Sequence, residues 1–555
     1  MLVRGGGATA MSAQASPSIP NAASTSVPAD PPSAWDRLRQ PVFRTLWTAA
    51  LVANVGLWMQ SVGAAWLMTS LTSSPMAVAS VQAATTGPMM LLALLAGALA
   101  DIVDGRRLLL WTQGWLLAML VALGAMTLAG ATTPWTLLGL TFLFGVGVAM
   151  STPAWQSVTL EAVPAGEVPA AVTLNGVSIN LARAIGPTVG GLVVAAAGPG
   201  PMFLLNALAY VATTVLLLRW RRTPRRTALP PEHVLQAMQV GLRFVRYDPA
   251  LRAALARTAI FVFFGSALWA LLPLVARREL GLDALGYGGL LAALGVGAVV
   301  GALILPTLRR RASIEQLVAA SSVLFAAAML ALAYLRAPLV LGAVLVPGGT
   351  AWLLLLSLHI VAALATVPAW VRARATAVVL LAFFGGMTIG SIAWGAVAQV
   401  VGIGPALTCA ALALVLSLAA RLRYRLTDDA PDLTPTHHWA EPPLVREPPP
   451  HRGPILVMVE YRIDPEQGRE FGLAMHDVRL DRLRNGATSW NLFTDPTDPG
   501  RYVELMAIST WEEHQRAHAR VTHADSVAEG RAKAFHVGPG PTVSTHLVGE
   551  PLPDR

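Results

Sequence analysis

Long uncharged apolar blocks are the feature of this sequence that most restricts its fold. Leu46–Met68, Val78–Ala100 and Leu108–Ala129 contain no Asp, Glu, Lys or Arg. Each is near or above the roughly 20 residues that a helix needs to cross a bilayer. In lipid, only helices and closed barrels satisfy every backbone group, and these blocks lack the alternation of barrel strands. The sequence therefore predicts a helical membrane protein.

The composition agrees with this prediction. Of the 555 residues, 54% are hydrophobic and 13% are charged, whereas soluble domains carry about a quarter charged residues. The fold class that we predict is an all-α membrane protein of twelve transmembrane helices with a small α+β domain at the C-terminus. The twelve spans are predicted at residues 44–68, 77–100, 108–129, 135–155, 171–197, 202–219, 253–275, 284–306, 314–335, 338–361, 376–400 and 403–422.

Arginine residues concentrate in alternate connections between the spans. Pairs or clusters of arginine follow spans 2, 6, 8, 10 and 12, whereas Arg277, Arg278 and Arg336 are exceptions because they lie in the other set of connections. The positive-inside rule then places both termini in the cytoplasm. We predict a multi-pass protein of the inner membrane. Because topology accounts for most of the +9 net charge, we predict no nucleic-acid partner.

The two halves of the membrane region repeat at a constant offset of 204 residues. Gly97-Ala98-Leu99 corresponds to Gly301-Ala302-Leu303, and Arg106-Arg107 corresponds to Arg310-Arg311. Further pairs extend the match through spans 2 to 6 and 8 to 12. The spans therefore form two parallel six-helix repeats, an organisation from which many secondary transporters are built.

The domain organisation follows from these patterns. Residues 231–247 of the central linker fit a helix that either lies along the inner membrane surface or is a solvated linker. The single cysteine, Cys409, excludes a disulfide within the chain and a cysteine-cluster metal site. The predicted segments are a disordered N-terminus (1–35), a first six-helix bundle (36–218), a cytoplasmic linker (219–252), a second bundle (253–426), a proline-rich linker (427–453) and a ferredoxin-like domain (454–555).

Charge returns abruptly in the segment GALADIVDGRR, residues 97–107. A carboxylate at the cytoplasmic end of span 2 can pair with arginine or face the positive end of a neighbouring helix. Glycine permits close helix approach at position 97 and a tight turn at position 105. The segment then forms a gate that opens and closes the cytoplasmic side, or it is a basic loop that only fixes topology. The residues concerned are Gly97, Asp101, Asp104, Gly105, Arg106 and Arg107.

Span 5 contains a group of small residues and one charge. Gly186, Gly190 and Gly191 flatten one helix face, and Pro187 removes a backbone donor and bends the helix. We expect this face to pack across the interface between the two halves. Arg183 is a cavity-lining cation that binds an anionic group, or it lies near the membrane edge beside Glu161 or Glu167.

Other polar side chains within the spans are candidates for a substrate cavity, because polar groups in lipid usually face the bundle interior. No acidic residue lies deep in a span, so no dedicated proton acceptor is visible in the sequence. The cavity candidates are Asn54, Trp58, Gln60, Gln82, Asn175 and Asn180.

The C-terminal region reads as β-α-β-β-α-β, which predicts a ferredoxin-like sheet. The predicted elements are 455–461, 465–483, 488–493, 502–508, 511–534 and 543–548. His514 and His518 lie four residues apart on the second helix, as a metal pair requires, but the sequence shows no third ligand. We interpret them as part of a solvated face and predict no metal site and no cofactor.

The quoted motifs resemble those of the major facilitator superfamily. GALADIVDGRR is similar to its loop signature between helices 2 and 3, and ARAIGPTVGG (182–191) resembles its antiporter-associated fifth-helix signature, with Ala182 where glycine is usual. Residues 43–75, 153–187 and 486–522 resemble the enterobactin-exporter-like, transmembrane secretion effector branch. The C-terminal region resembles the dimeric α/β barrels of antibiotic-biosynthesis monooxygenases.

The resemblance implies a secondary transporter, not an enzyme, that exports a small amphipathic compound, siderophore-like or drug-like, by proton antiport. Its expected partners are the lipid bilayer, the small-molecule substrate, protons and a second copy bound through the C-terminal domain. Two alternatives stay open. One is an enzyme–transporter fusion whose C-terminal domain acts on the cargo, and the other is an importer of the same fold.

Overall fold

The computed structural model describes residues 39–161, 167–219, 234–428, 431–436 and 447–550, so the N-terminus predicted to be disordered lies outside the described residues. Twelve of its helices are long and apolar enough to cross a membrane. The first half contains α1 Pro41–Leu71, α2 Pro75–Ile102, α3 Gly105–Leu128, α4 Pro134–Glu161, α5 Val168–Ala197 and α6 Pro199–Arg219. After α7 Val234–Tyr247, the second half contains α8 Pro249–Leu274 with a π-helical end to Glu279, α9 Ala284–Arg309, α10 Ile314–Tyr334, α11 Pro338–Ala365, α12 Arg372–Val401 and α13 Ile403–Leu416 with a 3-10 end to Leu422.

Local sequence signals fix where these helices begin. Proline, which needs no backbone partner in the first turn, is the first residue of several helices, including α1, α2, α4 and α8. Side-chain caps accept the next free N–H groups. Asp283 accepts from the N–H of Gly286 at the start of α9, and Ser313 forms a capping box with Gln316 at the start of α10.

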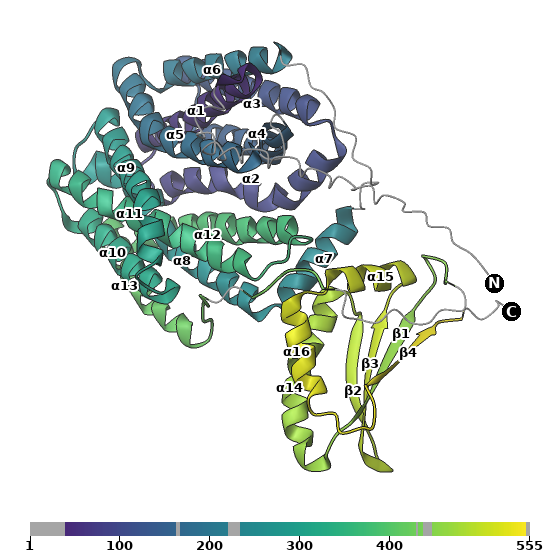
Figure 1. Ribbon diagram of the computed structural model, residues 1–555. Helices are drawn as coiled ribbons and strands as arrows, with labels where there is room; N and C mark the ends of the chain where they lie inside the picture. Colours follow the sequence, from purple (N-terminus) through teal and green to yellow (C-terminus); the bar gives the residue numbers. More distant parts are fainter. Residues whose placement is uncertain (1–38, 162–166, 220–233, 429–430, 437–446, 551–555) are drawn as a thin grey trace, which may run out of the picture.

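The predicted internal repeat is present in the structure. The bounds of α4 (134–161) and α11 (338–365) differ by 204 residues at both ends, as do those of α5 (168–197) and α12 (372–401). Gly198 and Gly402, which end the two latter helices, both have positive φ, at 86° and 91°. Only glycine adopts this conformation readily. The membrane region is therefore two parallel six-helix repeats (Figure 1).

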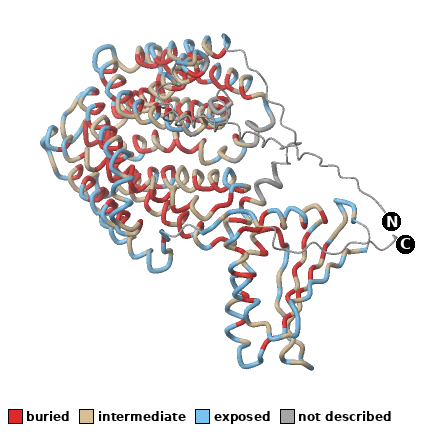
Figure 2. Tube along the Cα trace, viewed as in Figure 1, coloured by how far each residue is buried: buried red, intermediate tan, exposed pale blue. Residues whose placement is uncertain are grey.

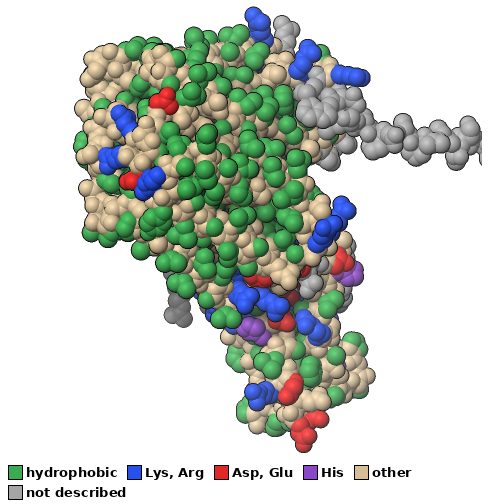
Figure 3. All heavy atoms as spheres, turned by 90° about the vertical axis from the view of Figure 1, so that its left-hand side faces the viewer, with side chains coloured by type: hydrophobic (Ala, Val, Ile, Leu, Met, Phe, Trp, Pro, Cys, Tyr) green, Lys and Arg blue, Asp and Glu red, His purple; other side chains and the backbone are tan. Residues whose placement is uncertain are grey.

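Burial and surface composition agree with a membrane-spanning bundle. Buried residues lie where helices face one another, and exposed residues lie on the outside (Figure 2). Hydrophobic side chains cover most of the visible surface of the helical region, whereas many of the charged side chains and the histidines in view lie on the smaller C-terminal domain (Figure 3). The twelve spans and this apolar surface make the chain a multi-pass membrane protein.

Connections alternate between two faces of the bundle, the basic face and the opposite face. The basic face carries residues 103–104, 310–313 and 366–371 together with α7 and the C-terminal domain. The opposite face carries residues 72–74, 129–133, 280–283 and 335–337.

The C-terminal domain is a four-stranded antiparallel sheet with helices on one side (Figure 1). The strand order β2-β3-β1-β4 is the order expected of the predicted ferredoxin-like fold. Its elements are β1 Ile455–Arg462, α14 Gly468–Asn485, β2 Ser489–Asp495, β3 Asp498–Ile508, α15 Trp511–Arg520, α16 His523–Lys533 and β4 Val543–Val548.

One predicted helix of this domain is two helices. The sequence predicted a single helix over 511–534, but the chain is extended at Val521 and Thr522, between α15 and α16. Thr522 and Asp525 form a capping box that starts α16. The same Thr522 pairs with Pro435 of the preceding linker. The cap and this pairing explain the break.

Helix α7 lies between the membrane bundle and the C-terminal domain (Figure 1), so it is not a solvated linker. Phe244 is fully buried and meets Trp370 edge to face, whereas Leu242 is half exposed. Arg243 forms an ion pair with Glu513 at 3.0 Å. Arg484 reaches Asp248 at 3.3 Å, and the Arg520 guanidinium lies 4.7 Å from the Trp370 ring. The C-terminal domain is thus docked on the bundle.

We expect the variant Arg243→Ala to loosen this docking. A partly exposed ion pair contributes up to about 1 kcal/mol, so amides of α15 should exchange hydrogen about two- to fivefold faster. Hydrogen–deuterium exchange of the full-length protein measures this effect. Arg246→Ala, an exposed arginine on the same helix, is the matched control and should leave the rates unchanged. Equal rates in both variants and the parent protein would show that the Arg243–Glu513 pair does not hold the domain.

Candidate functional site

Helices α5 and α9 form a close seam between the two halves. A Cβ atom added at Gly191 would lie 2.6 Å from the carbonyl oxygen of Ala284. Likewise, Cβ atoms at Gly288 and Gly295 would lie 2.5 Å and 2.8 Å from the carbonyl oxygens of Pro187 and Arg183. Contacts this short leave no room for any side chain, so glycine allows the two backbones to touch.

The other predicted glycines of α5 lie on a different side of the helix. Cβ atoms at Gly186 and Gly190 would meet Trp58 at 2.6 Å and the Cα of Met59 at 3.0 Å, both on α1. These two glycines therefore pack within the first half, and the expectation that all three cross the interface is wrong for them. Gly191 and the carbonyl of Pro187 face α9 across the seam.

Arg183 lies near the midpoint of α5, about 20 Å along the helix axis from either end. Its guanidinium lies 5.7 Å from the centre of the Trp58 ring. Its Nε and Nη1 atoms are buried and have no hydrogen-bond partner among the described residues. Of the two acids that the sequence offered as neighbours, Glu167 accepts a hydrogen bond from Gln40, and the side chain of Glu161 lies outside the described residues. A cation at this depth costs several kcal/mol unless it gains a partner.

A row of aromatic rings extends from Trp58 into the second half. The rings of Trp58 on α1 and Trp269 on α8 are 6.3 Å apart, and Trp269 is 5.4 Å from Trp352 on α11. The Nε1 atom of Trp269 is buried without a partner among the described residues. The row begins at Trp58 beside Arg183 and continues across the junction of the two halves to Trp269, which carries the unpaired donor.

The remaining polar candidates do not form one cluster in the described contacts. Asn180 donates to the carbonyl of Gly176 on its own helix. Gln60 is 2% exposed, and neither of its amide atoms has a partner among the described residues. Asn54, Gln82 and Asn175 are partly exposed.

Polar contacts between the halves gather at the opposite face. Arg277 donates to Thr69 at 3.0 Å and lies 5.1 Å from the Trp66 ring. Ser74 donates to Gln399 at 2.8 Å, which joins the start of α2 to the end of α12. Arg277 was an exception to the charge rule, and its position explains why it lies there. These contacts close the bundle at the opposite face.

The charged loop between α2 and α3 has a structural role in this conformation. Asp104 caps α3 by accepting from the N–H of Arg107 at 2.9 Å, and Arg107 is exposed. Arg106 donates to the carbonyls of Leu217 and Leu218 at 3.0 and 2.8 Å, so it caps the end of α6.

Two glycines and one carboxylate of this segment were also predicted to take part in the gate. A Cβ at Gly105 would lie 3.1 Å from Val158 of α4, whereas one at Gly97 would meet no described atom within 4 Å. Gly97 thus makes no close helix contact in this conformation, and its approach to another helix in a closed gate stays a prediction. Asp101 is in the last turn of α2, but its side chain lies outside the described residues, so its gating contact stays a prediction.

An ion pair that the sequence did not predict holds the segment that follows the last span. Arg257 of α8 is 4% exposed and lies 3.1 Å from Glu315 at the start of α10. Glu315 also accepts from the N–H of Leu426, and Arg257 donates to the carbonyl of Tyr424. The partners are 58 residues apart, so no local pattern could reveal the pair.

Comparison with known proteins identifies the family. The family model described as transmembrane secretion effector matches residues 32–552. The chain belongs to this family of major facilitator transporters. It is 30% identical over 265 residues to the multidrug efflux pump Tap of Mycolicibacterium fortuitum, a match that covers 44% of this chain and 64% of that protein. It is 27% identical over 273 residues to the enterobactin exporter EntS of Shigella boydii, covering 47% of this chain and 62% of that protein. The chain thus spans somewhat less than two thirds of the length of these two relatives.

A solved structure of a variant of the nucleoside transporter NupG shares the fold. The TM-score is 0.58 at 12% identity, and the match covers 69% of this chain and 100% of that chain. At this identity the similarity shows a shared fold of the membrane bundle.

We expect Gly191→Ala to disturb the seam of this transporter. The new methyl group would overlap the Ala284 carbonyl, and overpacking of this kind costs about 1–3 kcal/mol. Thermal unfolding of the purified protein should occur at a lower temperature, and transport should fall. Gly176→Ala on the same helix is the matched control, because a Cβ there meets nothing within 4 Å. Equal behaviour of the two variants would mean that α5 and α9 do not meet at Gly191.

Proposed function

We propose that this transporter exports a small amphipathic compound, with an anionic group and an aromatic ring, across the inner membrane by alternating access. The observation that carries the proposal is the buried Arg183 guanidinium, which lies over Trp58 with two nitrogen atoms unpartnered among the described residues. We assign the basic face to the cytoplasm and expect proton antiport.

The chemistry of the site supports this class of cargo. A carboxylate or catecholate would give Arg183 the charge-assisted hydrogen bonds that it lacks in the described structure. The rings of Trp58 and Trp269 would stack on an aromatic cargo, and the Trp269 N–H would donate to a polar group on it. The names of the two relatives, a multidrug efflux pump and an enterobactin exporter, favour export of such compounds.

The conformation supports the proposed cycle. The opposite face is held closed by Arg277–Thr69 and Ser74–Gln399. With the basic face in the cytoplasm, cargo would enter from there, and release would require these contacts to break. For proton coupling we propose Asp101, Asp104 or a group of the cargo as the carrier, because the sequence has no acidic residue deep in a span.

Transport by the variant Arg183→Gln tests the proposal. In inverted membrane vesicles, we expect uptake of an anionic catecholate, with enterobactin as the probe, to fall at least about tenfold, because losing a charge-assisted hydrogen bond costs about 1.5–3 kcal/mol. Arg183→Lys, which keeps the charge, should retain part of the uptake. Both variants should be present in the membrane at the parent level, as measured by immunoblot.

A cationic dye such as ethidium serves as the comparison substrate. If Arg183→Gln reduces uptake of the dye as strongly as uptake of the catecholate, the residue supports folding and does not select an anion. If neither uptake changes, the proposed cargo class is wrong.

For the C-terminal domain we propose homodimerisation through the open face of its sheet. The strand register places Leu456, Leu505 and Leu547 on the face away from the helices. Phe493, Val543 and Leu547 are 50%, 64% and 48% exposed. An apolar sheet face of this kind is usually covered by a second layer.

We expect residues 450–555 to form a dimer in solution, and Leu505→Asp to convert it to a monomer, because the carboxylate would lie at the centre of the joined faces. Light scattering coupled to size-exclusion chromatography measures the mass. Arg531→Asp, on the exposed side of α16, is the control and should stay dimeric. A monomeric parent domain would contradict the proposal.

A further inference from the structure

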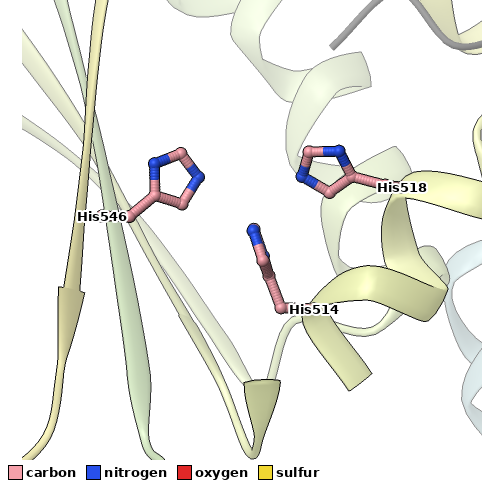
Figure 4. A group of neighbouring side chains, drawn as sticks. All are labelled: His514, His518 and His546. Atoms are coloured by element: carbon pink, nitrogen blue, oxygen red, sulfur yellow. The ribbon is translucent and has the colours of Figure 1, made fainter. Parts of the chain in front are cut away.

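Three histidine rings converge in the C-terminal domain. His514 and His518 extend from α15, and His546 extends from the edge strand β4, so that all three rings surround one space (Figure 4). The centre of the His514 ring lies 4.6 Å from the centre of the His518 ring and 4.9 Å from the centre of the His546 ring. One nitrogen from each ring lies within 4.8 Å of a nitrogen of the other two. The structure therefore supplies the third ligand that the sequence did not show.

His514 is not the solvated residue that the sequence suggested. It is 2% exposed, and neither ring nitrogen has a hydrogen-bond partner among the described residues. A buried imidazole without a partner loses the hydrogen bonds that it would make to water. A ligand in the shared space would remove this penalty.

We propose that His514, His518 and His546 bind a divalent transition-metal ion such as Zn²⁺. Imidazole nitrogen is a preferred ligand of Zn²⁺, Cu²⁺ and Ni²⁺, whereas Mg²⁺ and Ca²⁺ prefer oxygen. Zn–N bonds of about 2.0–2.1 Å in a tetrahedral site put the nitrogens about 3.3 Å apart. The three rings thus need to close by at most about 1.5 Å, which small side-chain rotations provide.

The charge state of the rings suits this ligand. Burial, with smaller effects from His518 and His546, lowers the pKa of His514 to about 3, and burial also lowers the pKa of His546. Burial therefore favours the neutral form of both rings, which is the form that binds metal.

The position of the site leaves a fourth coordination position open and lets a bound ion link two elements of the domain. His518 and His546 are partly exposed, so a water molecule or a small ligand can reach a fourth position. The ion would tie β4 to α15. Glu513 and Arg520 of α15 also contact Arg243 and Trp370, so occupancy would hold rigid the helix that meets α7 and the bundle.

Metal binding to the full-length protein in detergent tests the proposal. The protein is purified with a tag that contains no histidine, treated with EDTA and titrated with Co²⁺, whose visible absorption reports nitrogen coordination. We expect one equivalent of Co²⁺ to bind per chain and Zn²⁺ to displace it. Zn²⁺ should also raise the unfolding temperature of the parent protein, because an ion that binds only the folded state stabilises it.

His518→Ala and His546→Ala each remove one partly exposed ligand and leave the buried core in place. Each should weaken Co²⁺ binding by at least about tenfold, since loss of even an outer-shell partner costs about 10–100-fold. His476→Ala, on the exposed side of α14, is the matched control and should bind like the parent. Absence of Co²⁺ absorption in the parent protein, or binding by the His518→Ala/His546→Ala double variant equal to the parent's, would overturn the proposal.

Discussion

The close approach of α5 and α9 is the constraint on which the arrangement of the membrane region depends. Three glycines on the two helices let backbone touch backbone, and added Cβ atoms there would lie 2.5–2.8 Å from carbonyl oxygens. In lipid, where apolar surface gains little by association, such close packing and polar contacts hold helices together. The seam joins the two six-helix repeats and fixes α5 so that Arg183 lies beside Trp58. The polar contacts at the opposite face close the same junction on one side.

In the proposed function, the cargo binds at Arg183, whose Nε and Nη1 atoms are buried without a partner among the described residues. Arg183 lies midway along a span, next to a row of aromatic rings that crosses from one repeat to the other. A cargo bound there, as we propose, would touch both halves, and its binding energy would then differ between the two conformations of the proposed alternating-access cycle. At the basic face, Phe244 and Arg243 of α7 and Asp248, the N-cap of α8, connect this bundle to the C-terminal domain.

Much of the fold could be predicted from the sequence, because hydropathy, proline starts and the repeat are local or periodic signals. The offset of 204 residues recurs in the bounds of α5 and α12, and the strands and helices of the C-terminal domain follow one another as predicted, except that the second helix is divided. Long-range contacts could not be predicted. His546 meets His514 only because β4 pairs with β1. Arg257 of α8 meets Glu315 of α10, which is 58 residues away in the sequence. The free space around Gly97 depends on where the other helices lie. The break before α16 arises from a cap and from pairing with the linker.

The most direct test of the account is the distance between the halves at each face during transport. Spin labels would replace Ala131 and Ala337 on the opposite face, and Val103 and Arg311 on the basic face, all exposed positions, in a Cys409→Ser background. Double electron–electron resonance in lipid nanodiscs then measures both pairs. At rest, the Ala131–Ala337 pair should give a single distance. With cargo present and the pH lowered, a second, longer distance should appear there while the basic-face pair shortens. An opposite-face distance that stays the same under conditions that support transport would contradict the claim that contacts at this face open to release cargo.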